Sequence, residues 1–296
     1  MRLGPALALS LLICVACSSD GTGGSDAARY LGSFTWTDPD PTFGGLSALE
    51  LSDDGLSAVV LSDRSRVMTA RLQRDGDGRI TGAELANMRR LRGSTGKFLT
   101  HEVADSEGLA VAPDGSIYIS FEGVHRVVRY DRLDGPAHGI SDPDVFRGMK
   151  QNKSLEALAI DPQGRLVTMP EGYRDGDGNI PVYRREKGGW RVVFALPARG
   201  SFLPVGADFG PDGRLYLLER ALGLVGFRSR LRRWTVTETG PGEEQTLLTT
   251  ATGTHDNLEG LSIWRDGTGR LRATMVADDN FLRFQRTELV DYILPD

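Results

Sequence analysis

Cysteine is almost absent from this chain of 296 residues, because its only two cysteines, Cys14 and Cys17, stand near the N-terminus. A disulfide framework is therefore excluded for the body of the protein, and so is a thiol nucleophile. The sequence also contains neither Gly-x-Ser-x-Gly, the nucleophile motif of many serine esterases, nor His-Glu-x-x-His, a zinc-binding motif. Any catalysis must then use other groups, and carboxylates are plentiful.

Positive charge is in short supply. Lysine and arginine number 35 against 40 aspartates and glutamates, which leaves a formal net charge of −5 and a pI near 5.5. Binding to nucleic acid needs a clustered basic surface, so we expect no nucleic-acid partner. A negatively charged protein is better suited to holding divalent cations.

Long hydrophobic runs are also missing, apart from residues 3–15, which follow Arg2. This run is too short to span a bilayer and has the shape of a secretory signal. Residues 1–16 are therefore predicted to be a signal peptide. Export is the expected consequence.

The residues after this run are small and polar. Ala16 precedes Cys17, and residues 17–29 are predicted to form a flexible tether. The segment resembles a bacterial lipoprotein signal, which implies acylation of Cys17, a place on the periplasmic side of the cell envelope, and membrane contact through the lipid alone. Cys14 stands where leucine is usual in such signals, and the alternative is a plain signal peptide cleaved nearby.

Glycine and proline punctuate the rest of the chain. The 37 glycines and 14 prolines stand mostly as single residues between short runs of Val, Ile, Leu and Tyr. This pattern is typical of many tight turns and few helices. We predict an all-β fold, with residues 30–296 as a single domain.

A short motif, Glu followed by a small residue and Leu, repeats along this domain. It occurs as Glu107-Gly108-Leu109, Glu156-Ala157-Leu158 and Glu259-Gly260-Leu261, and related segments start at Gly44 and Val205. A period of about fifty residues with several strands per unit is typical of a β-propeller. Five blades are predicted, with residues 30–36 completing the last one. Six blades are the alternative, because the long first unit can be divided differently.

A second carboxylate follows each of these glutamates. Glu107 and Glu122 are symmetric about Asp114-Gly115, Glu156 and Glu171 about Gln163-Gly164, and Glu259 and Asp278 about Thr268-Gly269. Two-residue hairpin turns at these centres would make each pair a cross-strand pair, where like charges repel. A propeller would bring all the pairs to one mouth of its central channel. A bound cation would explain why the arrangement repeats.

These segments resemble the phytase-like family, exported proteins described as having esterase-like activity of phytase. The resemblance runs from about residue 44 to 294, through Ser62-Asp63-Arg64, Asp105-Ser106-Glu107-Gly108-Leu109, Met169-Pro170-Glu171, Leu218-Glu219-Arg220 and Asp278-Asp279-Asn280-Phe281. It implies a propeller and a hydrolase of phosphoric or carboxylic esters.

Carboxylate oxygens gathered from several strands suit Ca²⁺, which takes six to eight oxygen ligands. The candidate metal ligands are Glu107, Glu156, Glu259, Asp278, Asp279 and Glu219, and the candidate catalytic residues are Glu122, Glu171, Asp63, Arg64 and Arg220. The two arginines would bind the oxygens of a small-molecule ester, and Glu122 or Glu171 would take a proton from water. The alternative is a non-catalytic propeller that binds a ligand or protein partner at the same face.

Overall fold

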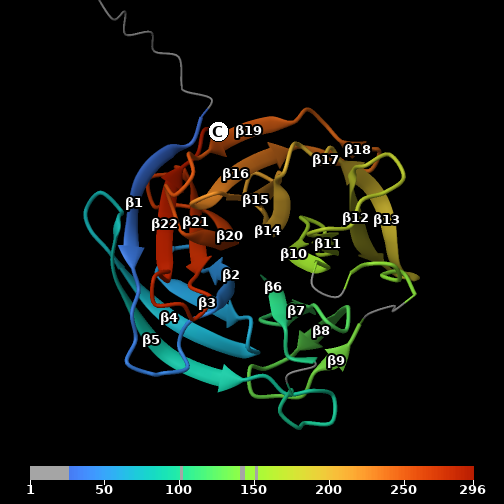
Figure 1. Ribbon diagram of the computed structural model, residues 1–296, viewed down its shortest axis with the longest axis horizontal. Helices are drawn as coiled ribbons and strands as arrows, with labels where there is room; N and C mark the ends of the chain where they lie inside the picture. Colours follow the sequence, from blue (N-terminus) through green and yellow to red (C-terminus); the bar gives the residue numbers. More distant parts are fainter. Residues whose placement is uncertain (1–26, 101–102, 141–143, 151–152) are drawn as a thin grey trace, which may run out of the picture.

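The computed structural model describes residues 27–100, 103–140, 144–150 and 153–296. The predicted signal peptide and Cys17 lie outside these ranges. Five four-stranded antiparallel sheets stand around a central axis and form a five-bladed propeller (Figure 1). The prediction of five blades is confirmed, and the six-blade alternative is wrong. Within the described residues, no helix is long and apolar enough to cross a membrane.

Each blade is a meander whose first strand lies at the axis. Blade 1 comprises β2 (Leu46–Leu51), β3 (Ser57–Ser62), β4 (Arg66–Arg74) and β5 (Ile80–Arg90). Blade 2 comprises β6 (Ser106–Val111), β7 (Ile117–Phe121), β8 (Arg126–Tyr130) and β9 (His138–Gly139). Blade 3 comprises β10 (Leu155–Ile160), β11 (Leu166–Pro170), β12 (Ile180–Glu186) and β13 (Gly189–Leu196). Blade 4 comprises β14 (Leu203–Phe209), β15 (Leu215–Gly223), β16 (Gly226–Trp234) and β19 (Gln245–Thr249), with the small hairpin β17 (Val236–Thr237) and β18 (Gly240–Pro241) inserted; blade 5 comprises β20 (Asn257–Arg265), β21 (Leu271–Asp278), β22 (Glu288–Ile293) and the N-terminal β1 (Arg29–Thr35).

The N-terminal strand closes the ring. β1 pairs antiparallel with β22, with Arg29 opposite Ile293 and Thr35 opposite Glu288. Residues 30–36 were predicted to complete the last blade, and this prediction is confirmed. The strands between residues 29 and 293 thus form a closed ring.

The hairpins that join the first two strands of blades 2 to 5 share one turn. In blade 2 the N–H of Ala112 donates to the carbonyl of Ser116 (2.8 Å), and Gly115 has φ of 83°. The same pattern recurs at Gly164, Gly213 and Gly269. This is a three-residue loop with glycine in the left-handed region. The predicted turn positions are confirmed, but the two-residue turn type is wrong.

Every inner strand carries a β-bulge close to its start. The register shifts at Ser47 in β2, between Ser106 and Leu109 in β6, at Glu156 in β10, at Val205 in β14 and at Glu259 in β20. Bulges redirect side chains and are frequent next to binding sites. The first repeat therefore aligns at Ser47, three residues later than the predicted start at Gly44.

The bulges also change which residues face one another. The N–H of Glu122 donates to the carbonyl of Asp105, and Asp278 is opposite Asn257. The predicted cross-strand pairing of Glu107 with Glu122, and of Glu259 with Asp278, is thus wrong by two residues. The bulge and the longer turn each add to the shift.

The small residue of the repeated motif packs against the next blade. A Cβ on Gly108 would stand 2.5 Å from the carbonyl oxygen of Glu156, and one on Gly206 would collide with that of Glu259. A Cβ on Gly260 would meet the backbone of β2. The inner strands therefore approach one another closely around the axis, and they leave a recess of only about 10 Å³. The channel is filled by packing, so the site above it is open from one end only.

Candidate functional site: the acidic mouth

The acidic mouth is the end of the ring where the inner strands begin and the second strands end. Eight carboxylates gather there: Asp63, Asp105, Glu107, Glu122, Glu156, Glu171, Glu259 and Asp278. They come from blades 1, 2, 3 and 5, and each interacts electrostatically with carboxylates of other blades or of its own. The convergence of acidic residues at one mouth agrees with the expectation from the repeated motif.

Three of these carboxylates are grouped most tightly. One oxygen from each of Asp105, Glu107 and Glu122 lies within 4.8 Å of the other two. Burial, followed by repulsion from Glu156 and Glu259, raises the pKa of Glu107 well above its usual range. Burial also raises the pKa of Asp105. An all-oxygen set of this kind fits a hard cation such as Ca²⁺.

Asp105 was missed as a candidate ligand. It is the backbone partner of Glu122 and lies two residues before the bulged Glu107. A bulge cannot be recognised from the symmetry of a hairpin, so counting outward from the turn placed Glu107 in its position. Ser154 and Asn257 hold the same place in blades 3 and 5.

Glu122 connects blade 2 to blade 3. Its Oε1 accepts a 2.6 Å hydrogen bond from the backbone N–H of Ser154, and its side chain also hydrogen-bonds with Glu156. Burial raises the pKa of Glu122 to about 7. Burial and the charge of Glu122 raise the pKa of Glu156 well above its usual range. Because the two carboxyl groups hydrogen-bond with each other, the protonation of one depends on that of the other.

Arg220 neutralises the opposite side of the mouth. Its guanidinium donates to Glu259, to Glu171 (3.0 Å) and to Asn257 Oδ1 (2.7 Å). Burial alone would lower the pKa of Arg220, but Glu259, Glu156 and Glu171 together raise it. Since its nitrogens already serve these partners, Arg220 is an internal counter-ion here, which differs from its predicted role in binding a substrate.

Asp63 and Asp278 extend the mouth across blades 1 and 5. Burial raises the pKa of Asp63 to about 6, although the neighbouring Arg64 opposes the shift. Burial and the charge of Glu259 raise the pKa of Asp278 to about 8. Both carboxyl groups thus favour the protonated form more than free aspartate does.

Two predicted metal ligands have other tasks. Asp279 accepts hydrogen bonds from the backbone of Gly45 and Phe281 and from the hydroxyl of Thr287. Glu219 is 0% exposed, and both of its oxygens receive donors from Arg230 and Arg232. The structure therefore corrects their placement, because each carboxylate has its oxygens occupied by hydrogen bonds or ion pairs of the fold.

A further acidic residue, Asp208, lies toward the other end of the channel. Its Oδ2 accepts a 2.6 Å hydrogen bond from the N–H of Ile263, which is near the end of β20. Glu50 interacts with it there, and burial raises the pKa of Asp208 to about 7. Asp208 follows Val205 by three residues, and at that distance along an inner strand it has left the mouth.

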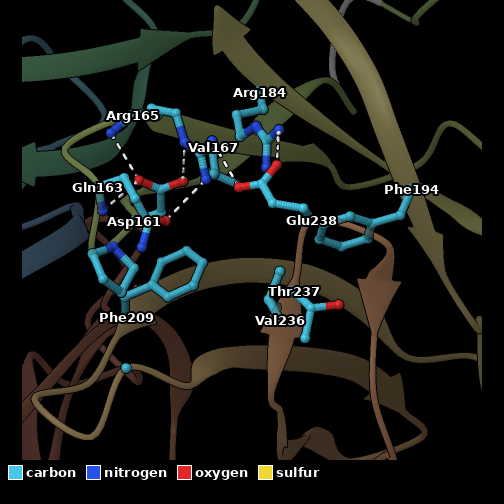
Figure 2. A pocket seen from close by; sticks show the side chains of 12 residues that line it. Asp161, Gln163, Arg165, Val167, Arg184, Phe194, Phe209, Val236, Thr237 and Glu238 are labelled. Carbon is cyan, nitrogen blue, oxygen red and sulfur yellow. Dashed lines mark hydrogen bonds and ion pairs between the residues drawn. The ribbon is translucent and has the colours of Figure 1, made fainter.

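A recess between blades 3 and 4 is also at that opposite end. Figure 2 shows this pocket of about 250 Å³, with Phe194, Phe209 and Val236 around it and Glu238 reaching toward two arginines. Glu238 forms ion pairs with Arg165 (3.0 Å) and Arg184 (3.2 Å). The charges of this pocket neutralise one another, whereas the acidic mouth has an excess of carboxylates.

Comparison with solved structures shows the same kind of fold. An endo-arabinase from Bacteroides thetaiotaomicron is 12% identical, with a TM-score of 0.52 over 89% of this chain and 99% of that chain. A virginiamycin B lyase from Staphylococcus aureus is 15% identical, with a TM-score of 0.42 over 90% and 74%. The PQQ-bound aldose sugar dehydrogenase from Streptomyces coelicolor is 12% identical, with a TM-score of 0.44 over 88% and 98%. Only the first similarity is high enough to support the architecture, and none informs on activity.

The search of curated proteins found no match. The phytase-like family model, described as esterase-like activity of phytase, matches residues 41–281. That match includes all five inner strands and every carboxylate of the acidic mouth. The chain therefore belongs to the phytase-like family.

Proposed function

We propose that the protein is a metal-dependent hydrolase of phosphoric or carboxylic esters, and that its active site is the acidic mouth. The observation that carries this proposal is the grouping of Asp105, Glu107 and Glu122 within 4.8 Å of one another. Three carboxylates this close are unfavourable unless they are protonated or hold a cation. The membership of an esterase-like family supports the reaction class.

Asp105, Glu107 and Glu122 would hold the cation, and Ca²⁺ is the ion that their oxygen-only chemistry favours. A bound cation in such a site polarises an ester oxygen and makes a bound water more acidic. Glu156, which hydrogen-bonds with Glu122, would accept the proton of the attacking water. Arg220 would hold Glu171 and Glu259 in place on the other side of the mouth through its ion pairs with them.

The site is tested by assaying p-nitrophenyl phosphate and p-nitrophenyl acetate with Ca²⁺ or with a chelator. Metal-dependent turnover is expected in the wild type and is expected to fall at least a hundredfold, on the order of one lost charge-stabilising group, in Glu107→Gln. Glu238→Gln, on the opposite face, is the matched control and should retain the wild-type rate. Turnover that is absent under all conditions, despite binding of Ca²⁺, would leave a non-catalytic binding propeller.

We also propose that the protein is exported and anchored by a lipid on Cys17 at the periplasmic side of the envelope. The support is the sequence of the first 17 residues. Incorporation of labelled palmitate into the wild type, and its loss in Cys17→Ser, is the expected result. An unlabelled wild type would favour simple secretion.

A further inference from the structure

Arg64 lies at the rim of the acidic mouth and is held differently from Arg220. Its guanidinium carbon stands 3.4 Å from the centre of the Phe281 ring. Its side chain is exposed, and within the described residues no acceptor takes a hydrogen bond from its guanidinium. A guanidinium stacked on an aromatic face keeps its N–H edge free. Arg64 therefore has unused donors, whereas those of Arg220 are occupied.

The backbone next to Arg64 and at Phe281 has conformations that are rare for residues other than glycine. Among described residues, the three non-glycine residues with positive φ are Ser65 (52°), Asn280 (48°) and Phe281 (52°). Ser65 directly follows Arg64. Asn280 and Phe281 belong to the segment whose aromatic side chain stacks on Arg64. Backbone in this region is unfavourable for such residues and persists only where surrounding contacts enforce it.

Those contacts are visible in the structure. The N–H of Phe281 donates to Asp279 (3.0 Å), and the same carboxylate accepts from Gly45 (2.9 Å) and from Thr287 (3.0 Å). The Phe281 ring lies so close over Gly45 that a Cβ there would collide with it. Gly45 itself has φ of 61°. The role of Asp279, predicted to be a ligand, is thus to fix the loop that carries Phe281.

Arg64 lies beside a site that is rich in carboxylates. The charge of Arg64 lowers the pKa of Asp63, whereas the charges of Asp105 and Glu259 raise it. An anion would be repelled by these carboxylates, unless a cation at Asp105, Glu107 and Glu122 offsets them. A ligand with an anionic oxygen group could then bridge the cation and Arg64, in the manner of charge-assisted pairs.

From this geometry we propose that Arg64 recognises an anionic group of the substrate, a phosphoryl or carboxylate group, and that Phe281 is the positioning residue that presents Arg64 to it. The inference rests on the proposed function in that it places the substrate at the acidic mouth. It adds that neutral esters are poor substrates and that one arginine, not two, provides recognition.

The test is calorimetric titration of the protein with phenylphosphonate and, separately, with benzoate, each in Ca²⁺ buffer. Phenylphosphonate binding that Arg64→Gln weakens roughly tenfold to a hundredfold is expected, from the typical strength of charged hydrogen bonds. Phe281→Leu should weaken phenylphosphonate binding about threefold to fivefold, and Phe281→Tyr, which keeps the aromatic ring, should bind as the wild type does. A preference for benzoate with the same ranking would identify a carboxylate as the group recognised.

Ca²⁺ titration of the same variants separates this proposal from the proposed function. Arg64→Gln and Phe281→Leu should bind Ca²⁺ as the wild type does, because neither contacts the grouped carboxylates. If turnover is found, Phe281→Leu should raise KM for p-nitrophenyl phosphate more than it raises KM for p-nitrophenyl acetate. The inference would be overturned if Arg64→Gln bound both anions as tightly as the wild type does, or if the wild type bound neither anion. This would hold even if Ca²⁺-dependent hydrolysis of neutral esters were observed.

Discussion

The backbone N–H of Ser154 donates a 2.6 Å hydrogen bond to Oε1 of Glu122. Ser154 directly precedes β10 of blade 3 and Glu122 directly follows β7 of blade 2, so this bond joins two blades at the proposed cation site. It also orients the carboxylate next to Asp105 and Glu107. Occupation of the site should therefore stabilise the ring as a whole.

Ca²⁺ is expected to raise the melting temperature of the wild type, because a ligand that binds only the native state stabilises it by mass action, about 2.7 kcal/mol at a hundredfold excess over Kd. Glu122→Gln should lose most of this shift. Differential scanning calorimetry with Ca²⁺ and with a chelator measures it. Glu238→Gln provides the control, and a wild type unaffected by millimolar Ca²⁺ would exclude the site.

Glu107→Gln is expected to act in opposite directions with and without metal. In a chelator the substitution removes a carboxyl group whose ionised form Glu156 and Glu259 repel, and should therefore stabilise the protein. In Ca²⁺ the same variant should be less stable than the wild type. Urea unfolding in both buffers tests this, and destabilisation in both would show that the carboxylate is a structural group.

Arg220→Met is expected to destabilise the protein by about 3–5 kcal/mol, since it leaves Glu259 buried without its counter-ion and Glu171 with only Lys153. Arg191→Met, at an exposed ion pair with Glu186, should cost less than about 1 kcal/mol. Chemical denaturation of both variants makes the comparison. Similar small losses would mean that water or a cation compensates the two glutamates.

The metal-free protein is expected to lose stability as the pH rises. The pKa of Glu122 is raised from 4.5 to about 7 and that of Asp278 from 3.8 to about 8, so the native state holds more protons than the unfolded state across this window. The free energy of unfolding must then fall as the pH rises, and the contribution of these groups is lost above about 8.

Urea unfolding in chelator at pH 5 and pH 8 measures this fall. Ca²⁺ should reduce it, because the cation replaces the bound protons. The double variant Glu122→Gln with Asp278→Asn should show a flatter profile in chelator. A wild-type profile that is already flat would contradict the raised pKa values.

Gly206→Ala is expected to cost about 1–3 kcal/mol, because its Cβ would collide with the carbonyl of Glu259 on the next inner strand. Gly267→Ala, where a Cβ would meet nothing within 4 Å, is the control and should change stability by a few tenths of a kcal/mol at most. Thermal unfolding distinguishes them. Equal stability of the two variants would show that the inner strands can separate without penalty.

Much of the architecture could be predicted from the sequence, because its period and turn glycines are local signals. Five repeats, the turn positions and the closing role of residues 30–36 follow from spacing and composition alone. The convergence of Glu107, Glu156 and Glu259 follows from the topology of any propeller. The pairing within each hairpin does not, because a bulge inserts a residue without changing the residue types around it.

The errors in the site have two physical causes. Glu219 precedes Arg220 on a strand, and successive side chains point to opposite faces, so the two cannot both face the mouth. Alternation in the sequence was enough to show this. Asp279 is different, because its side chain folds back onto nearby backbone N–H groups, and such local hydrogen bonding depends on a loop conformation that no pattern predicts.

The first strand, β1, starts at the end of blade 5 that is remote from the acidic mouth, since Arg29 is opposite Ile293 and Ile293 is opposite Arg272. Residues 18–26 could extend over at most about 30 Å, so a lipid on Cys17 would keep that remote rim close to the bilayer. The acidic mouth would then face the aqueous compartment, away from the bilayer. An enzyme mounted in this way would serve water-soluble, diffusing esters and would have no direct access to those embedded in its own membrane.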